Sequence, residues 1–385
     1  MKKEDYLDAY GTLETVEHER LGRYIAFIPQ QLPPDVMYGD VRFFRSLFDA
    51  TRSLSKLSGM CVQLPNPGIL ITPYLRREAV LSSQIEGARV SISELLLSEA
   101  QDTEDAGATR EVFNYIVALR YAIEKISKGE RITTGLVRKM HTLLMYGVRG
   151  EDMRPGEYRS VQNWIAPPFT GISDATFVPP PPERVSGLME DLVRYINDDS
   201  DDEIPLVKCA LMHYQFETIH PFCDGNGRIG RALVTLYLCR CGIIEKPILY
   251  ISGYFSEHKN EYMALLRETN MHATFTQWLL FFFEALCVQA DDAQARARAL
   301  ISLRESYREK VLLRGYPSRY LSVVDELFYN PYVTFKKVES VAGVSYPTAR
   351  GIIDALVKEG ILSLTEAPGR AAVYVAHDIL SHISR

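Results

Sequence analysis

The chain has 385 residues, and 43 lysines and arginines against 49 aspartates and glutamates give it a formal net charge of −6. Hydrophobic residues make up 46% and charged residues 24% of the sequence. This average composition excludes a disordered chain, a collagen-like fibre and a small disulfide scaffold, and the acidic balance argues against broad coating of nucleic acid. The charged N-terminus and the shortness of the apolar runs favour a soluble cytoplasmic protein.

Helical periodicity of apolar residues dominates the chain from Pro73 onward. The segment 150–182 differs, because it is rich in glycine and proline and predicts a loop with a small hairpin. We therefore expect a mostly α-helical core with a small β-hairpin. The expected helices are a long one from Pro73 to Leu97, followed by 110–126, 133–145, 182–197, 204–218, 228–240 and 256–270. The segment 274–314 is expected to be one long helix or two in succession.

The C-terminal segment, residues 317–385, has a different pattern. Helical periodicity is followed by two short alternating stretches, which together predict a winged helix-turn-helix domain. Seven basic and seven acidic residues leave this segment without an overall positive charge, so a protein-interaction or dimerisation role is favoured slightly over DNA binding. The expected elements are helices 320–329, 334–341 and 345–359 and strands 361–364 and 371–375.

The strongest chemical signal is the segment His220-Pro-Phe-Cys-Asp-Gly-Asn-Gly-Arg-Ile-Gly-Arg231, which joins two predicted helices. Glycines here let the backbone approach an anion closely, and the N–H groups that begin the next helix favour negative charge. Arg228 and Arg231 are three apart and share a helix face, where two guanidinium groups can grip successive phosphates. His220 can take up a proton near neutral pH, and Asp224 suits Mg²⁺ beside phosphate oxygens.

The segment has two alternative interpretations. Gly225-Asn-Gly-Arg-Ile-Gly230 satisfies the dinucleotide fingerprint G-x-G-x-x-G, but that fingerprint requires a preceding strand, and the preceding residues 206–218 are helical in pattern. A plain glycine-rich turn with solvated arginines is the structural alternative. The density of chemically useful residues within twelve positions favours a phosphate site.

The segment resembles the signature of the Fic family, H-P-F-x-[DE]-G-N-G-R-x-x-R, at every defined position. The resemblance implies a mostly helical Fic core and a protein adenylyltransferase, which transfers AMP from ATP to Ser, Thr or Tyr hydroxyls of target proteins and of itself. His220 would be the general base, and Asp224 would hold Mg²⁺ between the α- and β-phosphates. The implied nucleotide-binding residues are Phe222, Asp224, Gly225, Asn226, Gly227, Arg228, Arg231 and, near the adenine, Tyr262, for which core packing is the alternative; Asn270 is a weaker candidate.

A second motif, Ser82-Ser-Gln-Ile-Glu86-Gly87, resembles the inhibitory motif of the family, [ST]-x-x-x-E-[GN]. Ser82 and Glu86 are four apart and so share a helix face. In the family this glutamate pairs with the second arginine of the signature, here Arg231, and competes with the γ-phosphate. The resemblance therefore implies autoinhibition by Glu86, and it leaves removal of AMP at the same site open. A solvated helix-surface glutamate is the alternative.

The resemblance extends over roughly residues 24–288 and implies a flap at Thr176, Phe177 and Val178, which would dock a target segment by strand addition; an ordinary loop is the alternative. Homodimers that control inhibition occur in the family. A competing hypothesis is a transcriptional regulator in which the Fic site senses a nucleotide. The predicted domains are 1–109, an N-terminal helical region with the inhibitory helix; 110–290, the Fic catalytic core; 291–316, a connector helix; and 317–385, the winged-helix domain.

Overall fold

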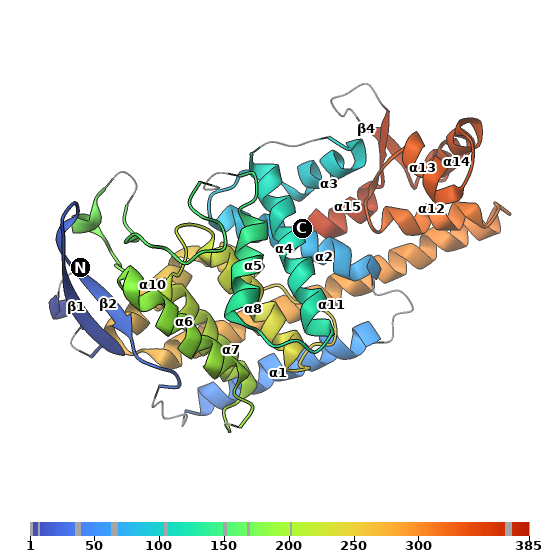
Figure 1. Cartoon of the computed structure of the whole chain (residues 1–385). Coiled ribbons are helices and arrows are strands. Elements are labelled where there is room, and N and C mark those ends of the chain that lie inside the picture. The colour runs from blue at the N-terminus through green and yellow to red at the C-terminus, as the bar shows by residue number, and fades with distance from the viewer. Residues whose placement is uncertain are drawn as a thin grey trace.

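The structure is a computed structural model, which describes residues 3–6, 8–34, 40–62, 68–103, 107–148, 152–167, 170–200, 202–365 and 372–384. Within these residues the chain is mostly helical and carries two small antiparallel sheets, so the predicted fold class is confirmed. Figure 1 shows an elongated molecule with the β1–β2 hairpin at one end and the C-terminal helices at the other. Within the described ranges, the helices are too short or too polar to cross a bilayer.

The N-terminal region was predicted to be helical but also contains a hairpin. After a short 3-10 helix, η1 (Lys3–Tyr6), strand β1 (Gly11–His18) pairs with β2 (Gly22–Pro29), and Gly11 lies opposite Pro29. The cause lies in the composition, because β2 is built from Tyr, Ile and Phe residues that favour strands. The pairing of β1 with β2 was not predicted from the sequence.

Two long helices form the spine of the molecule. Helix α1 (Val41–Val62) packs along α11 (Phe275–Leu313), which is continuous and runs toward the C-terminal helices (Figure 1). The predicted connector begins inside α11, where Ala293 and Ala297 are buried, so this stretch packs on the core as well as leading out of it. The predicted domain limits stay predictions.

The other helices of the core surround the motif-bearing pair, α7 and α8. These two helices are almost entirely buried, as expected for central helices. The long helix predicted from Pro73 to Leu97 is in fact two helices, because Gly87 adopts φ = 98° and ends the first of them. The predicted helix 256–270 is likewise a pair. The bounds are α2 (Gly68–Ile85), α3 (Ile92–Gln101), α4 (Ala108–Ser127), α5 (Thr134–Leu144), α6 (Pro182–Asn197), α7 (Pro205–Ile219), α8 (Asn226–Arg240), α9 (Ser252–Glu257) and α10 (Lys259–His272).

The C-terminal segment contains the three predicted helices and a three-stranded sheet in the order β3-β5-β4. Strand β3 and the last helix were not predicted, and residue 371 lies outside the described residues. This element order agrees with a winged helix-turn-helix, which stays a prediction. The bounds are α12 (Arg319–Leu327), β3 (Tyr332–Thr334), α13 (Phe335–Ala342), α14 (Tyr346–Lys358), β4 (Ser363–Thr365), β5 (Val373–Val375) and α15 (His377–Ser384).

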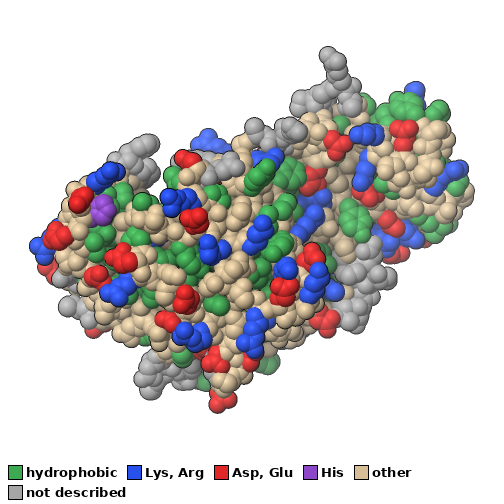
Figure 2. All heavy atoms as spheres, viewed as in Figure 1, with side chains coloured by type: hydrophobic (Ala, Val, Ile, Leu, Met, Phe, Trp, Pro, Cys, Tyr) green, Lys and Arg blue, Asp and Glu red, His purple; other side chains and the backbone are tan. Residues whose placement is uncertain are grey.

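The exposed face of α14 mixes charges of both signs. Arg350 and Lys358 are exposed on it, but Arg350 Nε lies 3.8 Å from a carboxylate oxygen of Asp354. Figure 2 shows basic and acidic side chains interspersed on the visible face of the molecule. A DNA-binding surface usually has a basic stripe, so this arrangement gives the regulator hypothesis no specific support.

Trp278 is expected to be a major contributor to the stability of the core. Its ring is fully buried, and its Nε1–H donates to the carbonyl oxygen of Ala210 at 2.9 Å, which joins α11 to α7. Because Trp278→Ala leaves a large cavity and removes the hydrogen bond between α11 and α7, we expect it to lower the free energy of unfolding by about 3–5 kcal/mol. Denaturant titration measures this, with Trp164→Ala, a change at a half-buried tryptophan, as the matched control. Equal losses in both variants would contradict the assignment.

Candidate active site

The turn between α7 and α8 is held by its own backbone and by one asparagine. Helix α7 ends at Ile219, the following residue His220 adopts φ = 50°, and Gly225 at φ = 78° precedes α8. The side-chain amide of Asn226 accepts from the backbone N–H of Phe222 and donates to its carbonyl group, both at 2.8 Å. The Asn226 amide, which was predicted to donate to a phosphate, therefore holds the turn instead. The N–H groups that begin α8 are the ones suited to bind an anion.

His220 is placed as a neutral base. Its Nδ1 lies 3.2 Å from the carbonyl oxygen of Glu217, which can only accept, so Nδ1 carries the hydrogen and Nε2 keeps its lone pair. Burial lowers the pKa of His220 to about 4, although the hydrogen bond to Glu217 opposes the shift. The imidazole is therefore uncharged at neutral pH and able to accept a proton.

Two residues that sequence reasoning did not single out support the loop. Arg159 Nε donates to the carbonyl oxygen of His220 at 2.9 Å. The ring of His141 stacks on Phe222 at 3.8 Å between centroids, and its Nε2 lies 3.0 Å from the carbonyl oxygen of Asp224. The Phe222 ring is fully buried, so it supports the loop from behind, and a part in nucleotide binding would be indirect.

The predicted pairing of the two motifs is present in the structure. Arg231 is fully buried, and its Nη2 lies 2.8 Å from Glu86 Oε1. The same guanidinium group donates to the hydroxyl and the carbonyl oxygen of Ser82, both at 2.9 Å. A Cβ on Gly227 would lie 2.2 Å from Glu86 Oε1, so glycine is what lets the carboxylate approach. Burial acts to raise the pKa of Glu86, but the Arg231 guanidinium outweighs it and holds that pKa below its usual value.

The other arginine of the signature has different partners. Arg228 is buried, with Nη1 3.1 Å from Glu111 Oε2 of α4 and Nη2 3.5 Å from Asp224 Oδ1. Arg228 and Arg231 are thus held by different carboxylates, although they start from one helix face. Gly87 lies just beyond the end of α2, where its positive φ ends the inhibitory helix.

Asp224 is the candidate magnesium ligand. Its side chain is 46% exposed beside the loop. The part of the chain that the structure describes contains no cluster of three His, Cys, Asp or Glu side chains suited to a metal ion. A single carboxylate next to an anion site nevertheless fits Mg²⁺, which is commonly held by one or two carboxylates together with substrate phosphates and water.

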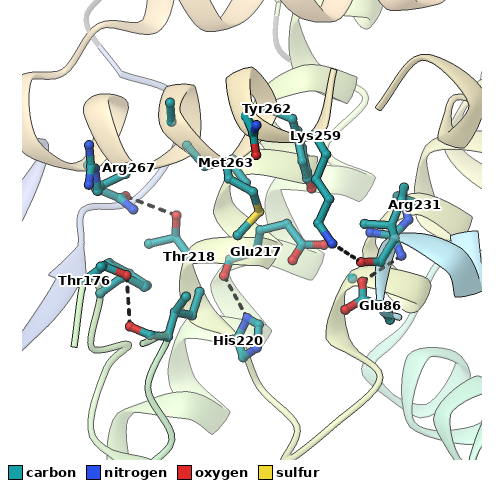
Figure 3. A pocket seen from close by; sticks show the side chains of 18 residues that line it. Glu86, Thr176, Glu217, Thr218, His220, Arg231, Lys259, Tyr262, Met263 and Arg267 are labelled. Atoms are coloured by element: carbon teal, nitrogen blue, oxygen red, sulfur yellow. Dashed lines mark hydrogen bonds and ion pairs between the residues drawn. The ribbon is translucent and has the colours of Figure 1, made fainter. Parts of the chain in front are cut away.

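The site opens into a cavity of about 530 Å³, a size that suits a small-molecule ligand. Figure 3 shows its walls, which come from α2, α7, α8, α10 and the flap. The predicted base, arginine and inhibitory glutamate lie in one space, together with charged residues that the sequence did not reveal. The lining includes Glu86, Thr176, Phe177, Glu217, His220, Gly227, Arg231, Lys259, Tyr262, Arg267 and Asn270.

Tyr262 lines the cavity and also packs in the core. Its ring lies 4.4 Å from that of Phe255, between centroids, and its hydroxyl group lies 2.9 Å from His213 Nε2. Asn270 is buried, and its Oδ1 accepts from Tyr214 at 2.6 Å and from Thr218 at 3.1 Å. The Tyr262 side chain therefore packs in the core, as the alternative interpretation proposed. A contact between Tyr262 and adenine stays a prediction.

The flap is an isolated bridge rather than a full hairpin. Ile165 pairs with Phe177, and the hydroxyl group of Thr176 donates to the carbonyl oxygen of Ile165 at 3.0 Å. On the other side, the backbone N–H of Phe27 in β2 donates to the carbonyl oxygen of Val178 at 2.9 Å. The N-terminal hairpin thus supports the flap, and target docking there stays a prediction.

The turn between α7 and α8 thus brings a buried arginine, a neutral histidine and a glutamate that follows α2 to one cavity. Residues 44–124 match the N-terminal domain of the Fic/DOC family, and residues 131–238 match the Fic/DOC family domain itself. The chain therefore contains both domains of the Fic/DOC family.

The chain is similar to curated relatives over part of their length. It is 26% identical over 194 residues to a probable protein adenylyltransferase of Aquifex aeolicus, which covers 50% of this chain and 54% of the relative. It is 36% identical over 164 residues to protein adenylyltransferase fic-1 of Caenorhabditis elegans, covering 42% of this chain and 29% of the relative. The chain thus spans about half, or less, of these relatives.

Solved structures share the fold. A Fic family protein from Desulfovibrio desulfuricans G20 matches with a TM-score of 0.57 at 20% identity, covering 90% of this chain and 98% of that one. A Fic domain containing signaling protein from Bacteroides thetaiotaomicron matches with a TM-score of 0.51 at 23% identity, covering 66% of this chain and 95% of that one. At this identity the likeness shows the fold alone.

Proposed function

We propose that this chain is a protein adenylyltransferase, which transfers AMP from ATP to Ser, Thr or Tyr hydroxyls of a target protein and of itself. The observation that carries the proposal is that His220 and Arg231 line one cavity, with Arg231 at the start of α8. Relatives named as protein adenylyltransferases support the class of reaction. The target is proposed to dock at the flap beside this cavity.

The reaction is a displacement at the α-phosphorus. The target hydroxyl oxygen forms a bond to phosphorus, the bond between the α-phosphorus and the bridging oxygen breaks, and pyrophosphate leaves with the electron pair. His220 Nε2 accepts the hydroxyl proton. Arg231 and the N–H groups at the start of α8 bind the phosphates, and Asp224 would hold Mg²⁺, which neutralises phosphate charge when bound.

Glu86 is proposed to restrain this reaction. Its carboxylate occupies the Arg231 guanidinium group, which the γ-phosphate needs in order to bind with the α-phosphate aligned for attack. The same carboxylate lies in the cavity with His220. With an AMP-modified target bound, it would be able to orient water for removal of the AMP group, which we propose as the second activity of the site.

Labelled ATP distinguishes AMP transfer from phosphoryl transfer. The Glu86→Gly variant is incubated with Mg²⁺ and ATP that carries radioactive phosphorus at either the α or the γ position. We expect label on protein from α-labelled ATP only, and no label when Glu86→Gly is combined with His220→Ala. Label from the γ position would contradict the proposal.

A further inference from the structure

Glu217 is a buried acid of the cavity that the proposed reaction does not use. It lies on the last turn of α7, one turn before His220. Its Oε1 is buried and makes no hydrogen bond within the described part of the chain. Figure 3 shows its side chain extending across the cavity toward the side where Lys259, Arg231 and Glu86 lie.

Two glycines of α8 bring Glu217 and Glu86 to the same helix face. Gly227 and Gly230 are three apart and so share that face. A Cβ on Gly227 would lie 2.2 Å from Glu86 Oε1, and one on Gly230 would lie 2.1 Å from Glu217 Oε1. Each carboxyl group therefore lies where only glycine leaves room, and Arg231 follows directly after Gly230.

Burial of Glu217 favours its protonated form while Glu86 is docked. Burial raises the pKa of Glu217 to about 8, the positive charge of Arg231 opposes this, and the negative charge of Glu86 adds to it. At neutral pH the cavity thus holds one charged carboxylate and one neutral carboxylic acid. The titratable and charged groups that line the cavity with Glu217 are Glu86 after α2, His220 at the end of α7, Arg231 of α8, and Lys259, Tyr262 and Arg267 of α10.

Withdrawal of Glu86 leaves the Arg231 guanidinium group without a counter-charge. The guanidinium group is fully buried, and Glu86 is its ion-pair partner within the described residues. A buried charge without a counter-charge is strongly unfavourable. When the like charge of Glu86 leaves, Glu217 loses one of the causes that keep it protonated, so its carboxylate becomes the available counter-charge.

We propose that Glu217 is a positioning residue that exchanges a proton with solvent as the occupant of Arg231 changes. It releases its proton when Glu86 leaves, so that Arg231 stays neutralised and in place. It takes the proton back when the phosphates of a nucleotide arrive, because two negative groups then face one guanidinium group. This inference rests on the proposed function, since it needs a nucleotide in the cavity.

Proton uptake during nucleotide binding tests the inference. The parent variant is Glu86→Gly/His220→Ala, which is expected to bind ATP without turnover and in which His220 cannot titrate. Calorimetry with Mg²⁺-ATP near pH 7.5, in two buffers of different ionisation enthalpy, counts the protons taken up. We expect uptake by the parent, none after adding Glu217→Gln, and unchanged uptake after adding Glu261→Gln, which changes an exposed acid of α10.

The pH dependence of affinity gives a readout that a purely structural role would not change. Because binding takes up a proton, the affinity of the parent falls by up to about tenfold per pH unit once pH rises above the pKa of Glu217 in the nucleotide-free protein, and it levels off when pH passes the pKa of Glu217 in the nucleotide-bound form. The Glu217→Gln form shows no such slope. Equal proton uptake by the parent and by its Glu217→Gln form overturns the inference. A pH-independent affinity of the parent also overturns it, and this second result does not require Glu217→Gln to fold. A folded parent that binds no ATP overturns the proposed function itself.

Discussion

The Glu86→Gly variant is expected to incorporate AMP about 5- to 150-fold faster than the unchanged chain, the range that a coupling of about 1–3 kcal/mol gives. The reason is competition for one group. In the structure Glu86 lies 2.8 Å from Arg231 Nη2, and a site that is only partly available binds its ligand with correspondingly lower apparent affinity. Removal of the carboxylate leaves the guanidinium group open to the γ-phosphate. Incorporation of AMP from α-labelled ATP measures the change.

Two further variants separate loss of the carboxylate from loosening of α2. Glu86→Gln keeps the size of the side chain and removes its charge, so it is expected to show partial release. Gln84→Gly places a glycine at an exposed position of the same helix turn, and AMP incorporation is expected to stay unchanged. Equal increases in Gln84→Gly and Glu86→Gly would show that helix loosening, rather than the Glu86 carboxylate, controls the site.

Removal of the imidazole is expected to have the largest effect of all. In the Glu86→Gly background, His220→Ala should lower the rate of AMP transfer by about 10²- to 10⁴-fold, the usual contribution of a general base. The change leaves Arg231 in place, so nucleotide binding is expected to persist while transfer is lost. His272→Ala, a change at an exposed histidine on α10, is the matched control. Equal rates with and without His220 would exclude it as the base.

The pH dependence of kcat/KM also tests the assignment of His220 as the general base. Burial lowers the pKa of His220 to about 4, and the neutral form is the base, so its fraction rises with pH and is nearly complete above about pH 5. In the Glu86→Gly/Glu217→Gln background, where Glu217 does not titrate, kcat/KM is therefore expected to be flat from about pH 5.5 to 8. A rise centred near pH 6.5, the value of an ordinary histidine, would contradict this placement.

The part of the site that lies in one continuous segment could be predicted, because neighbouring residues supply its chemical groups. The segment 220–231 supplies the turn, the base and both arginines, and its glycines have the positive φ or the close contacts that glycine permits. The pairing of Glu86 with Arg231 was found only through the resemblance, since 145 positions separate these residues. Spacing on a helix face places Glu86 with Ser82 but does not name its partner.

The supporting residues could not be predicted, because tertiary packing alone selects them. Nothing in the residues around His141 or Arg159 indicates that they hold the motif loop from two sides. Glu217 sits in an apolar helix next to the signature, and only the folded chain shows that its Oε1 is buried without a hydrogen bond within the described residues. Its importance depends on Gly230, a position that the signature leaves open.

In the fold, too, the locally determined elements could be predicted and those that depend on distant contacts could not. Helix α6 was predicted with its observed bounds, since Pro182 begins it and one face is apolar. The hairpin of residues 11–29 was missed although its composition favours strands, and β3 was missed because it has only three residues. Short strands depend on partners that are distant in sequence, whereas helices of this length carry their own period.

Intact-mass spectrometry of the protein after incubation with Mg²⁺-ATP tests the central claim most directly, namely that this site transfers AMP under the control of Glu86. The unchanged chain, Glu86→Gly and Glu86→Gly/His220→Ala are compared side by side, and modified peptides are mapped. The account predicts that Glu86→Gly gains the mass of AMP on a Ser, Thr or Tyr hydroxyl and that the other two gain little or none. An unchanged mass in Glu86→Gly, or the mass of a single phosphate in place of AMP, would contradict it.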